Sequence, residues 1–254
     1  MPSPPDRIAF SVFGFDIMWY GIIVTLAIAT AVFITCYRGK AHGISADKVI
    51  DFLIICVPMG LVGARLYYVL FNLNAFKDAP AQIFNIRAGG LAIHGALIFG
   101  LLTAVILCRL WRVGTLNAFD LAAPSLAIAQ AIGRWGNYMN QEAHGGPTDL
   151  PWAIVVDGVK VHPTFLYESL WCLLLFFILI SIDRRRKFDG QIFLIYCMMY
   201  SFERFFVEQL RTDSLILFGM FKQAQVLSCI VFVVCVPVYF WLKRRARFSD
   251  RLFY

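Results

Sequence analysis

Seven apolar stretches, each long enough to form a membrane-spanning helix, constrain this chain more than any other feature. They cover residues 17–37, 48–71, 90–111, 119–135, 163–182, 191–210 and 224–242. About 20 apolar residues cross the hydrocarbon core of a bilayer as a helix, which satisfies its own backbone hydrogen bonds there. Only 15% of the residues are charged, against about a quarter in soluble domains. We therefore expect an all-α integral membrane protein with seven transmembrane helices in one domain, residues 1–254.

The segments around these stretches refine the expectation. Residues 1–16 contain three prolines and no basic region followed by a cleavage site, so we expect no removable signal peptide. The fourth stretch is short and carries Pro124, which makes its limits less certain. Residues 136–162 are rich in glycine, proline and aspartate, and we expect them to form a short outward-facing segment between spans.

The distribution of lysine and arginine predicts the orientation. The loops on one side carry 14 of the 23 basic residues, and the loops on the other side carry 6: Arg7, Lys77, Arg87, Lys160, Arg211 and Lys222. Because basic residues stay on the cytoplasmic side, we expect the N-terminus outside and the C-terminus in the cytoplasm. The same asymmetry explains most of the net charge of +7, so nucleic acid is not an expected partner.

With this orientation, polar residues of six spans fall at one depth, near the outer leaflet. They are Tyr20, Arg65, His94, Arg134, Tyr167, Glu168, Arg204 and Glu208. Charged groups inside a membrane usually face the interior of a helix bundle or a wet cavity. The sequence therefore predicts one polar cavity that opens near the outer leaflet.

Four of the polar residues near the end of the sixth stretch share one helical face. They follow an i, i+4, i+8, i+11 pattern: Tyr200, Arg204, Glu208 and Arg211. An Arg204–Glu208 ion pair that merely tolerates burial is the alternative to a functional pair. From spacing alone, Arg65 and His94 each fit a structural role as well as a functional one.

Other chemistries lack their sequence patterns. The four histidines show no metal-ligand spacing, and there is no phosphate-binding glycine loop and no nucleophile motif of a hydrolase. The seven cysteines are scattered through the apolar stretches, where free cysteine behaves as a small hydrophobic residue. Arginines near the outer leaflet fit a phospholipid headgroup, because guanidinium binds phosphate through two hydrogen bonds. A histidine beside them could accept a proton from an incoming nucleophile at neutral pH.

Residues 133–142, Gly-Arg-Trp-Gly-Asn-Tyr-Met-Asn-Gln-Glu, resemble the signature Gly-Arg-x-Gly-Asn-Phe-Ile-Asn-x-Glu of the bacterial prolipoprotein diacylglyceryl transferases. Tyr138 and Met139 stand where Phe and Ile are usual. Shorter pieces agree in order along the chain: Trp19-Tyr20-Gly21, Gly63-Ala64-Arg65, Gly89-Gly90 with His94-Gly95, His162-Pro163-Thr164, Leu166-Tyr167-Glu168, and Arg204 with Glu208 and Arg211. The resemblance extends from the first stretch to the start of the seventh.

The resemblance implies an activity and its partners. The diacylglyceryl group of phosphatidylglycerol would be transferred to the lipobox cysteine of a preprolipoprotein, at the bacterial cytoplasmic (inner) membrane, with release of glycerol phosphate. No metal or organic cofactor is called for. The implied catalytic residues are His94, Arg134, Arg204 and Glu208. The implied substrate-binding residues are Tyr20, Arg65, Asn137, Asn140, Glu142 and Tyr167.

Two other functional classes remain as alternatives. A secondary transporter or lipid flippase would also need an anion site, but its site usually lies near the membrane midplane and its chain often shows an internal repeat. A lipid-binding scaffold without catalysis would need the arginines and not the histidine.

Overall fold

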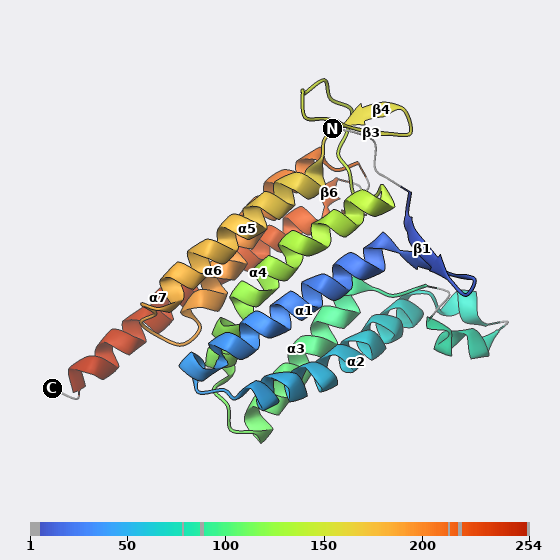
Figure 1. The fold of residues 1–254 in the computed structure, drawn as a ribbon. Coiled ribbons are helices and arrows are strands. Elements are labelled where there is room, and N and C mark those ends of the chain that lie inside the picture. The colour runs from blue at the N-terminus through green and yellow to red at the C-terminus, as the bar shows by residue number, and fades with distance from the viewer. Residues whose placement is uncertain (1–5, 78, 87–88, 213, 218–219, 253–254) are drawn as a thin grey trace. The chain divides into compact units, whose positions relative to one another are not determined.

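The computed structural model describes residues 6–77, 79–86, 89–212, 214–217 and 220–252, so Arg87 of the predicted outer loops lies outside the described part. Most of the described residues lie in long helices (Figure 1). These are α1 (Trp19–Gly39), α2 (Ala46–Phe71), α3 (Ile93–Leu110), α4 (Thr115–Asn140), α5 (Thr164–Asp183), α6 (Gln191–Leu210) and α7 (Gln223–Leu252). Each predicted apolar stretch corresponds to one of them.

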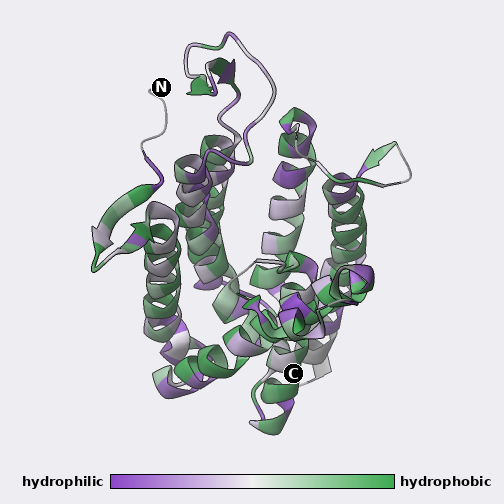
Figure 2. Ribbon diagram, turned by 90° about the vertical axis from the view of Figure 1, so that its right-hand side faces the viewer, coloured by the Kyte–Doolittle hydropathy of each residue, from purple (hydrophilic) through white to green (hydrophobic). Residues whose placement is uncertain are grey.

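Five helical segments of the described chain are long and apolar enough to cross a membrane: Trp19–His42, Ala46–Phe71, Ile93–Leu110, Thr164–Asp183 and Gln223–Ala246. Hydrophobic residues cover much of the length of the helices (Figure 2). The two long helices outside this group are α4, which carries Asp120 and Arg134, and α6, which carries Glu203, Arg204 and Glu208. The protein is therefore a mainly helical, multi-pass membrane protein.

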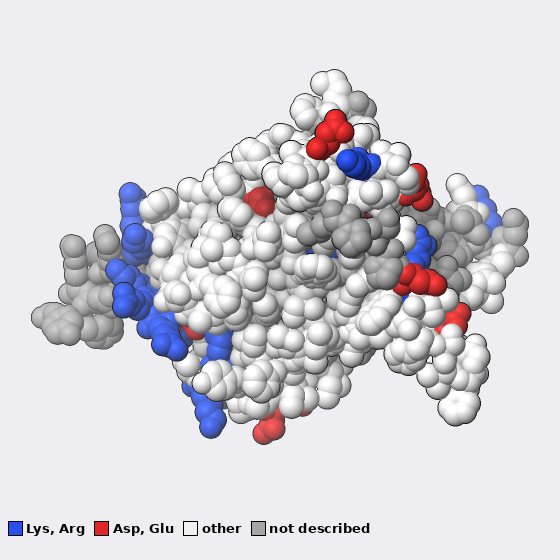
Figure 3. Space-filling model, turned by 45° about the horizontal axis from the view of Figure 1, so that its top comes forward, with Lys and Arg blue, Asp and Glu red and all other residues white. Residues whose placement is uncertain are grey.

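The chain divides into two compact units. The larger unit comprises residues 1–35 and 119–254, and the smaller unit comprises residues 36–118. In the larger unit, α6 contacts both α5 and α7 (Figure 1). Side chains of α4, α5 and α6 form its buried core: Ala123, Ala127, Leu175, Leu179, Ile192 and Tyr196. Lysine and arginine side chains gather near the C-terminal part of α7, which carries Lys243, Arg244 and Arg245 (Figure 3).

A buried carboxylate of α4 caps the start of α6 within this unit. Gly190, the residue before α6, supplies no side-chain cap. Instead the fully buried Asp120 accepts hydrogen bonds from the backbone N–H groups of Gly190 (2.7 Å) and Phe193 (2.8 Å). These N–H groups have no partner inside their own helix, and the carboxylate also complements the positive end of the helix dipole.

The smaller unit is built on the contact between α2 and α3, together with the short 3₁₀ helices η1 (Lys40–His42), η2 (Leu73–Phe76) and η3 (Pro80–Phe84). The two long helices approach closely at Gly63 and Gly95. A Cβ atom on Gly63 would overlap Phe99, and one on Gly95 would overlap the carbonyl oxygen of Gly63. Small residues at such a crossing let two helix backbones pack tightly in a membrane protein.

The described residues form three antiparallel hairpins that the sequence analysis did not predict, one before α1 and two in connections between helices. They pair β1 (Ile8–Val12) with β2 (Phe15–Met18), β3 (Ile154–Val156) with β4 (Val159–Val161), and β5 (Ile216–Leu217) with β6 (Phe221–Lys222). The β3–β4 turn is Asp157-Gly158, and both residues have positive φ (48° and 79°). Asp-Gly is a strong signal for the two-residue hairpin turn, and it could have been read from the sequence.

The predicted end of the fourth stretch was wrong. We expected a loop from residue 136, but α4 continues to Asn140. Gly136 remains helical because its missing side chain makes room for Tyr20: a Cβ atom there would lie 2.9 Å from the Tyr20 ring. Glycine lowers helix propensity by only about 1 kcal/mol relative to alanine, which tertiary packing readily overrides.

Candidate active site

Glu168, in the first turns of α5, is the centre of a cluster of charged side chains in the larger unit. Its side chain is 1% exposed. It forms ion pairs with Arg134 of α4, with Arg204 of α6 (Nη1 to Oε1, 3.0 Å) and with Arg211, which follows α6 (Nη1 to Oε1, 3.7 Å). One buried carboxylate therefore gathers three guanidinium groups.

Glu208 supplies the second carboxylate of this cluster. Its Oε2 lies 2.7 Å from Arg204 Nη2 and 4.0 Å from Arg211 Nε. The predicted pairing of Arg204 with Glu208, and the shared face of α6, are thus confirmed. The fourth residue of that face, Tyr200, accepts a hydrogen bond at its hydroxyl from Arg134 Nη2 (3.3 Å).

The electrostatics of the cluster favour an anion. Three arginines form ion pairs with two carboxylates, those of Glu168 and Glu208. The carboxylates are 1–4% exposed, whereas the arginine side chains are 12–18% exposed, so the cations are the more accessible groups. Arginine in such a setting binds phosphate or carboxylate oxygens through paired hydrogen bonds.

Glu203 adds a third buried carboxyl group one residue before Arg204. It is 5% exposed, and both of its oxygens are without a hydrogen-bond partner among the described residues. An unpartnered buried carboxyl group is costly, and such groups are often found where function requires them.

The polar residues of the 133–142 segment lie at the C-terminal end of α4 and contact one another. Asn137 and Asn140 both donate side-chain hydrogen bonds to Glu142 Oε1, at 2.9 and 3.4 Å. The backbone N–H of Glu142 donates to the carbonyl of Asn137 (3.1 Å), which closes the end of the helix. Because Asn137 follows Arg134 by three residues on α4, its amide lies on the same side of the helix as the arginine.

Tyr20 and Tyr167 occupy different surroundings within the larger unit. Tyr20 lies against Gly136 of α4, beside the segment just described. Tyr167 accepts a hydrogen bond from Trp152 Nε1 (2.9 Å), and its hydroxyl lies 3.4 Å from His162 Nδ1. Tyr167 therefore contacts Trp152 and His162, whereas its neighbour Glu168 contacts the arginines.

The remaining two predicted site residues, Arg65 and His94, belong to the smaller unit. His94 is the second residue of α3, and its ring lies 6.0 Å from that of Tyr67 on α2, centroid to centroid. Arg65 of α2 donates its hydrogen bonds to backbone carbonyl groups of residues 82–90.

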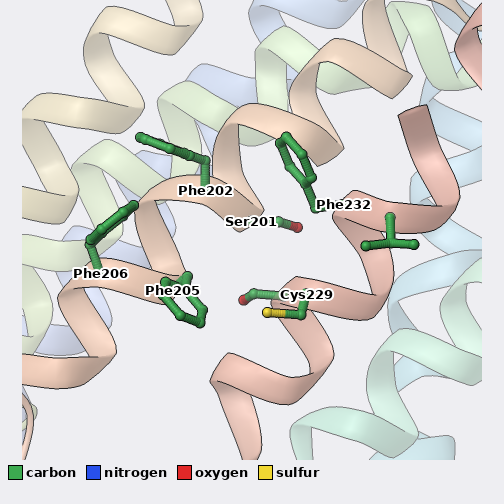
Figure 4. A pocket seen from close by; sticks show the side chains of 8 residues that line it. Ser201, Phe202, Phe205, Phe206, Cys229 and Phe232 are labelled. Atoms are coloured by element: carbon green, nitrogen blue, oxygen red, sulfur yellow. The ribbon is translucent and has the colours of Figure 1, made fainter.

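Apolar grooves flank the charged residues in each unit. In the larger unit, a groove of about 240 Å³ lies between α6 and α7, where Ser201 and Cys229 face each other and phenylalanines surround them (Figure 4). In the smaller unit, Arg65 is the charged member of a groove of about 320 Å³ whose other lining residues are apolar. Neither groove is the polar cavity predicted from the sequence, and that cavity stays a prediction.

Sequence reasoning did not include Glu168, Tyr200 or Glu203 among the site residues. The sequence did contain a signal for Glu168. A single carboxylate in an otherwise apolar stretch needs a cation as its partner, and the arginines predicted at the same depth are too many for Glu208 alone to pair. Tyr200 entered the sequence analysis only as the first residue of the i, i+4, i+8, i+11 pattern. Nothing in the sequence pattern distinguishes Glu203 from an exposed glutamate.

Comparison with known proteins gives consistent matches along nearly the whole chain. A family model described as prolipoprotein diacylglyceryl transferase matches residues 7–241. A protein of Clostridioides difficile (strain 630) named phosphatidylglycerol–prolipoprotein diacylglyceryl transferase is 46% identical over 240 residues, which cover 94% of this chain and 96% of that protein. Proteins of the same name from Finegoldia magna and Oceanobacillus iheyensis are 44% and 38% identical, and the matches cover 96% and 98% of this chain and 99% and 91% of those proteins.

Proposed function

The chain belongs to the prolipoprotein diacylglyceryl transferase family, and on this premise we propose that it transfers the diacylglyceryl group of phosphatidylglycerol to the lipobox cysteine of a preprolipoprotein. The reaction forms a thioether and releases glycerol phosphate, as the first step of lipoprotein maturation. The single structural observation that best supports it is the convergence of Arg134, Arg204 and Arg211 on Glu168.

The first chemical requirement is an activated sulfur nucleophile. A free thiol has a pKa of about 8.5, and its thiolate form is the nucleophile. We assign the role of proton acceptor to His94, because an imidazole titrates close to neutral pH. The sulfur then forms a bond to the glyceryl carbon while the bond from that carbon to the phosphate oxygen breaks, and the electron pair leaves with glycerol phosphate.

The second requirement is stabilisation of the charge that grows on the departing phosphate. Arg134 and Arg204 would bind the phosphate oxygens, and the Asn137 amide would add a donor. Glu208 would hold Arg204 in place through the 2.7 Å ion pair. Charge-assisted hydrogen bonds of this kind act most strongly where water is excluded, as it is from the interior of a helix bundle in a membrane.

Substrate binding would involve further residues of the predicted set. Tyr20, beside α4, would line the pocket, together with Asn140, Glu142 and Tyr167. Asn140 and Glu142 already form part of one hydrogen-bonded group with Asn137, which supports a shared role for the three.

Membrane placement is part of the proposal. We propose that all seven long helices cross the bacterial cytoplasmic (inner) membrane, with the N-terminus outside and the C-terminus in the cytoplasm. The cluster around Glu168 would then lie in a polar cavity near the outer leaflet, where phosphatidylglycerol headgroups are within reach. The basic C-terminal part of α7 supports this orientation (Figure 3).

The test is transfer by the purified protein in nanodiscs that contain phosphatidylglycerol. A lipobox peptide is added, and mass spectrometry measures its mass. We expect a diacylglyceryl adduct on the cysteine that is absent with a Cys→Ser peptide and with the Arg134→Ala enzyme. A well-folded protein that binds phosphatidylglycerol without forming the adduct would instead favour a lipid-binding scaffold or a transporter.

A further inference from the structure

The guanidinium group of Arg65 is held by backbone carbonyl oxygens. Nε donates to Ile83 O (2.7 Å), Nη2 to Gln82 O (2.5 Å), and Nη1 to Gly89 O (2.7 Å) and Gly90 O (3.0 Å). A guanidinium group has five N–H donors, so these four acceptors occupy most of its capacity. The side chain therefore ties α2 to two separate points of the segment 82–90.

Aromatic rings and burial reinforce this arrangement. The guanidinium carbon lies 5.8 Å from the Tyr68 ring centroid and 5.4 Å from that of Phe76. Arg65 as a whole is 9% exposed. Cation–π contacts add to the stability of a desolvated guanidinium.

Two glycines shape the backbone that Arg65 binds. Gly89 and Gly90 have φ values of +85° and +72°, a region that residues with a side chain rarely adopt. Their carbonyl groups both accept from Nη1. A Cβ atom on Gly90 would lie 2.5 Å from Arg65 Nη1, whereas one on Gly89 would meet no atom within 4 Å. The close contact of Gly90 with Arg65 therefore depends on the absence of a side chain.

The same part of α2 also holds the first turn of α3. The backbone N–H of Ala92, the residue before α3, donates to the carbonyl of Ala64 (3.1 Å). Gly95 packs against the backbone of Gly63, and His94 lies between these two contacts in the sequence. Residues 63–65 therefore hold the chain at three places: well before His94, at the start of α3, and just after His94.

We propose that Arg65 is a positioning residue that fixes the start of α3 and thereby orients His94, and that its guanidinium acts on the backbone of residues 82–90 rather than on the phosphate of the lipid. The proposal rests on the proposed function, because it takes His94 as the proton acceptor. It differs from the substrate-binding role predicted from the sequence, and the two roles have different kinetic signatures.

The kinetic test compares four variants in the nanodisc transfer assay: Arg65→Gln, Arg65→Lys, Gly90→Ala and Gly89→Ala. We expect Arg65→Gln to lower kcat by about 100-fold with little change in KM for phosphatidylglycerol, since a small displacement of a catalytic group costs this much. Arg65→Lys should not rescue kcat, because one ammonium group cannot reach all four carbonyls. Gly90→Ala should lower kcat similarly, although it keeps the guanidinium charge.

Gly89→Ala is the matched control for Gly90→Ala. Both substitutions place a side chain at positive φ, but only the one at Gly90 would collide with Arg65. We expect the control to lose distinctly less kcat. A rise in KM for phosphatidylglycerol at unchanged kcat in Arg65→Gln, with Gly90→Ala unaffected, would overturn the proposal in favour of a phosphate ligand. Near-normal kcat in both Arg65 variants would overturn it as well.

Hydrogen exchange gives a second readout that does not depend on catalysis. We expect amides in residues 89–96 to exchange faster in Arg65→Lys and Gly90→Ala than in the unmodified protein, while the exchange of α5 stays unchanged. Unchanged exchange at 89–96 would overturn the proposal even if activity fell. If the unmodified protein shows no transfer, the proposed function fails alone, and the exchange data still decide whether Arg65 fixes the start of α3.

Discussion

In the larger unit Arg134 and Arg204 bind carboxylates, whereas in the smaller unit Arg65 binds four backbone carbonyl oxygens. A carboxylate presents oxygens in a geometry similar to that of phosphate, so an arginine held by carboxylates is already oriented for an anionic substrate. An arginine held by backbone carbonyls has its donors committed to the path of the chain. Arginines that look alike in the sequence therefore have different uses, and their partners distinguish them.

The largest expected effect comes from removing the shared carboxylate of the arginine cluster. Glu168→Gln keeps the size of the side chain but removes the carboxylate that pairs with Arg134, Arg204 and Arg211, and Arg134 has no second carboxylate among its ion pairs in the described part of the chain; breaking a buried ion pair in this way costs about 3–5 kcal/mol of stability. We expect a large drop in the midpoint of thermal unfolding in detergent and loss of transfer. Leu170→Ala, at an exposed position two residues later, is the control. A stable and active Glu168→Gln protein would show that the cluster does not depend on this carboxylate.

The next largest effect should come from Arg134. Arg134→Ala is expected to lower kcat/KM for transfer by at least about 100-fold, as loss of a donor to a developing oxyanion does. Arg134→Lys should recover only part of this loss, because an ammonium group lacks the planar fork with which a guanidinium binds two oxygens at once. Complete recovery with lysine would mean that charge alone matters at this position.

A smaller effect is expected from Asp120, whose carboxylate accepts hydrogen bonds from the backbone. Asp120→Ala removes the acceptor of the Gly190 and Phe193 N–H groups, and we expect a loss of about 2 kcal/mol in stability. The partners of this carboxylate are the two backbone N–H groups and Arg186, which lie outside the arginine cluster, so kcat should change little. A large loss of kcat in a protein of nearly normal stability would contradict this assignment.

The smallest effect should come from Lys222 of β6. Its ammonium group donates to the carbonyls of Glu208 (2.7 Å), Gln209 (3.3 Å) and Arg211 (2.7 Å) at the end of α6. Lys222→Met keeps the aliphatic part of the side chain, and we expect it to cost about 1 kcal/mol through loss of the favourable charge at a helix C-terminus. The thermal midpoint should fall slightly, and the drop should be smaller than that of Asp120→Ala.

The sequence predicted the helices well, because apolar stretches of membrane length leave few alternatives to a helix. It failed at the end of α4, where composition suggested a loop from Gly136 and packing against Tyr20 keeps the segment helical to Asn140. The hairpins were missed because they are short and lie beside much stronger apolar signals.

The candidate site was predictable only in part. The Arg204–Glu208 pair follows from i, i+4 spacing, which is a local property of one helix. The central role of Glu168 depends on the packing of α4, α5 and α6, and the sequence does not specify which side chains meet across three helices. The hydrogen-bond partners of Arg65 could not be predicted either, because they are backbone carbonyl groups, which every residue has.

The cap that α4 provides for α6 has a consequence for the order in which the chain folds. A ribosome releases Asp120 well before Gly190 and Phe193, which lie 70 and 73 residues later. The acceptor for the first turn of α6 therefore exists before its donors are synthesised. When α6 is synthesised, α4 is therefore already available to cap its first turn.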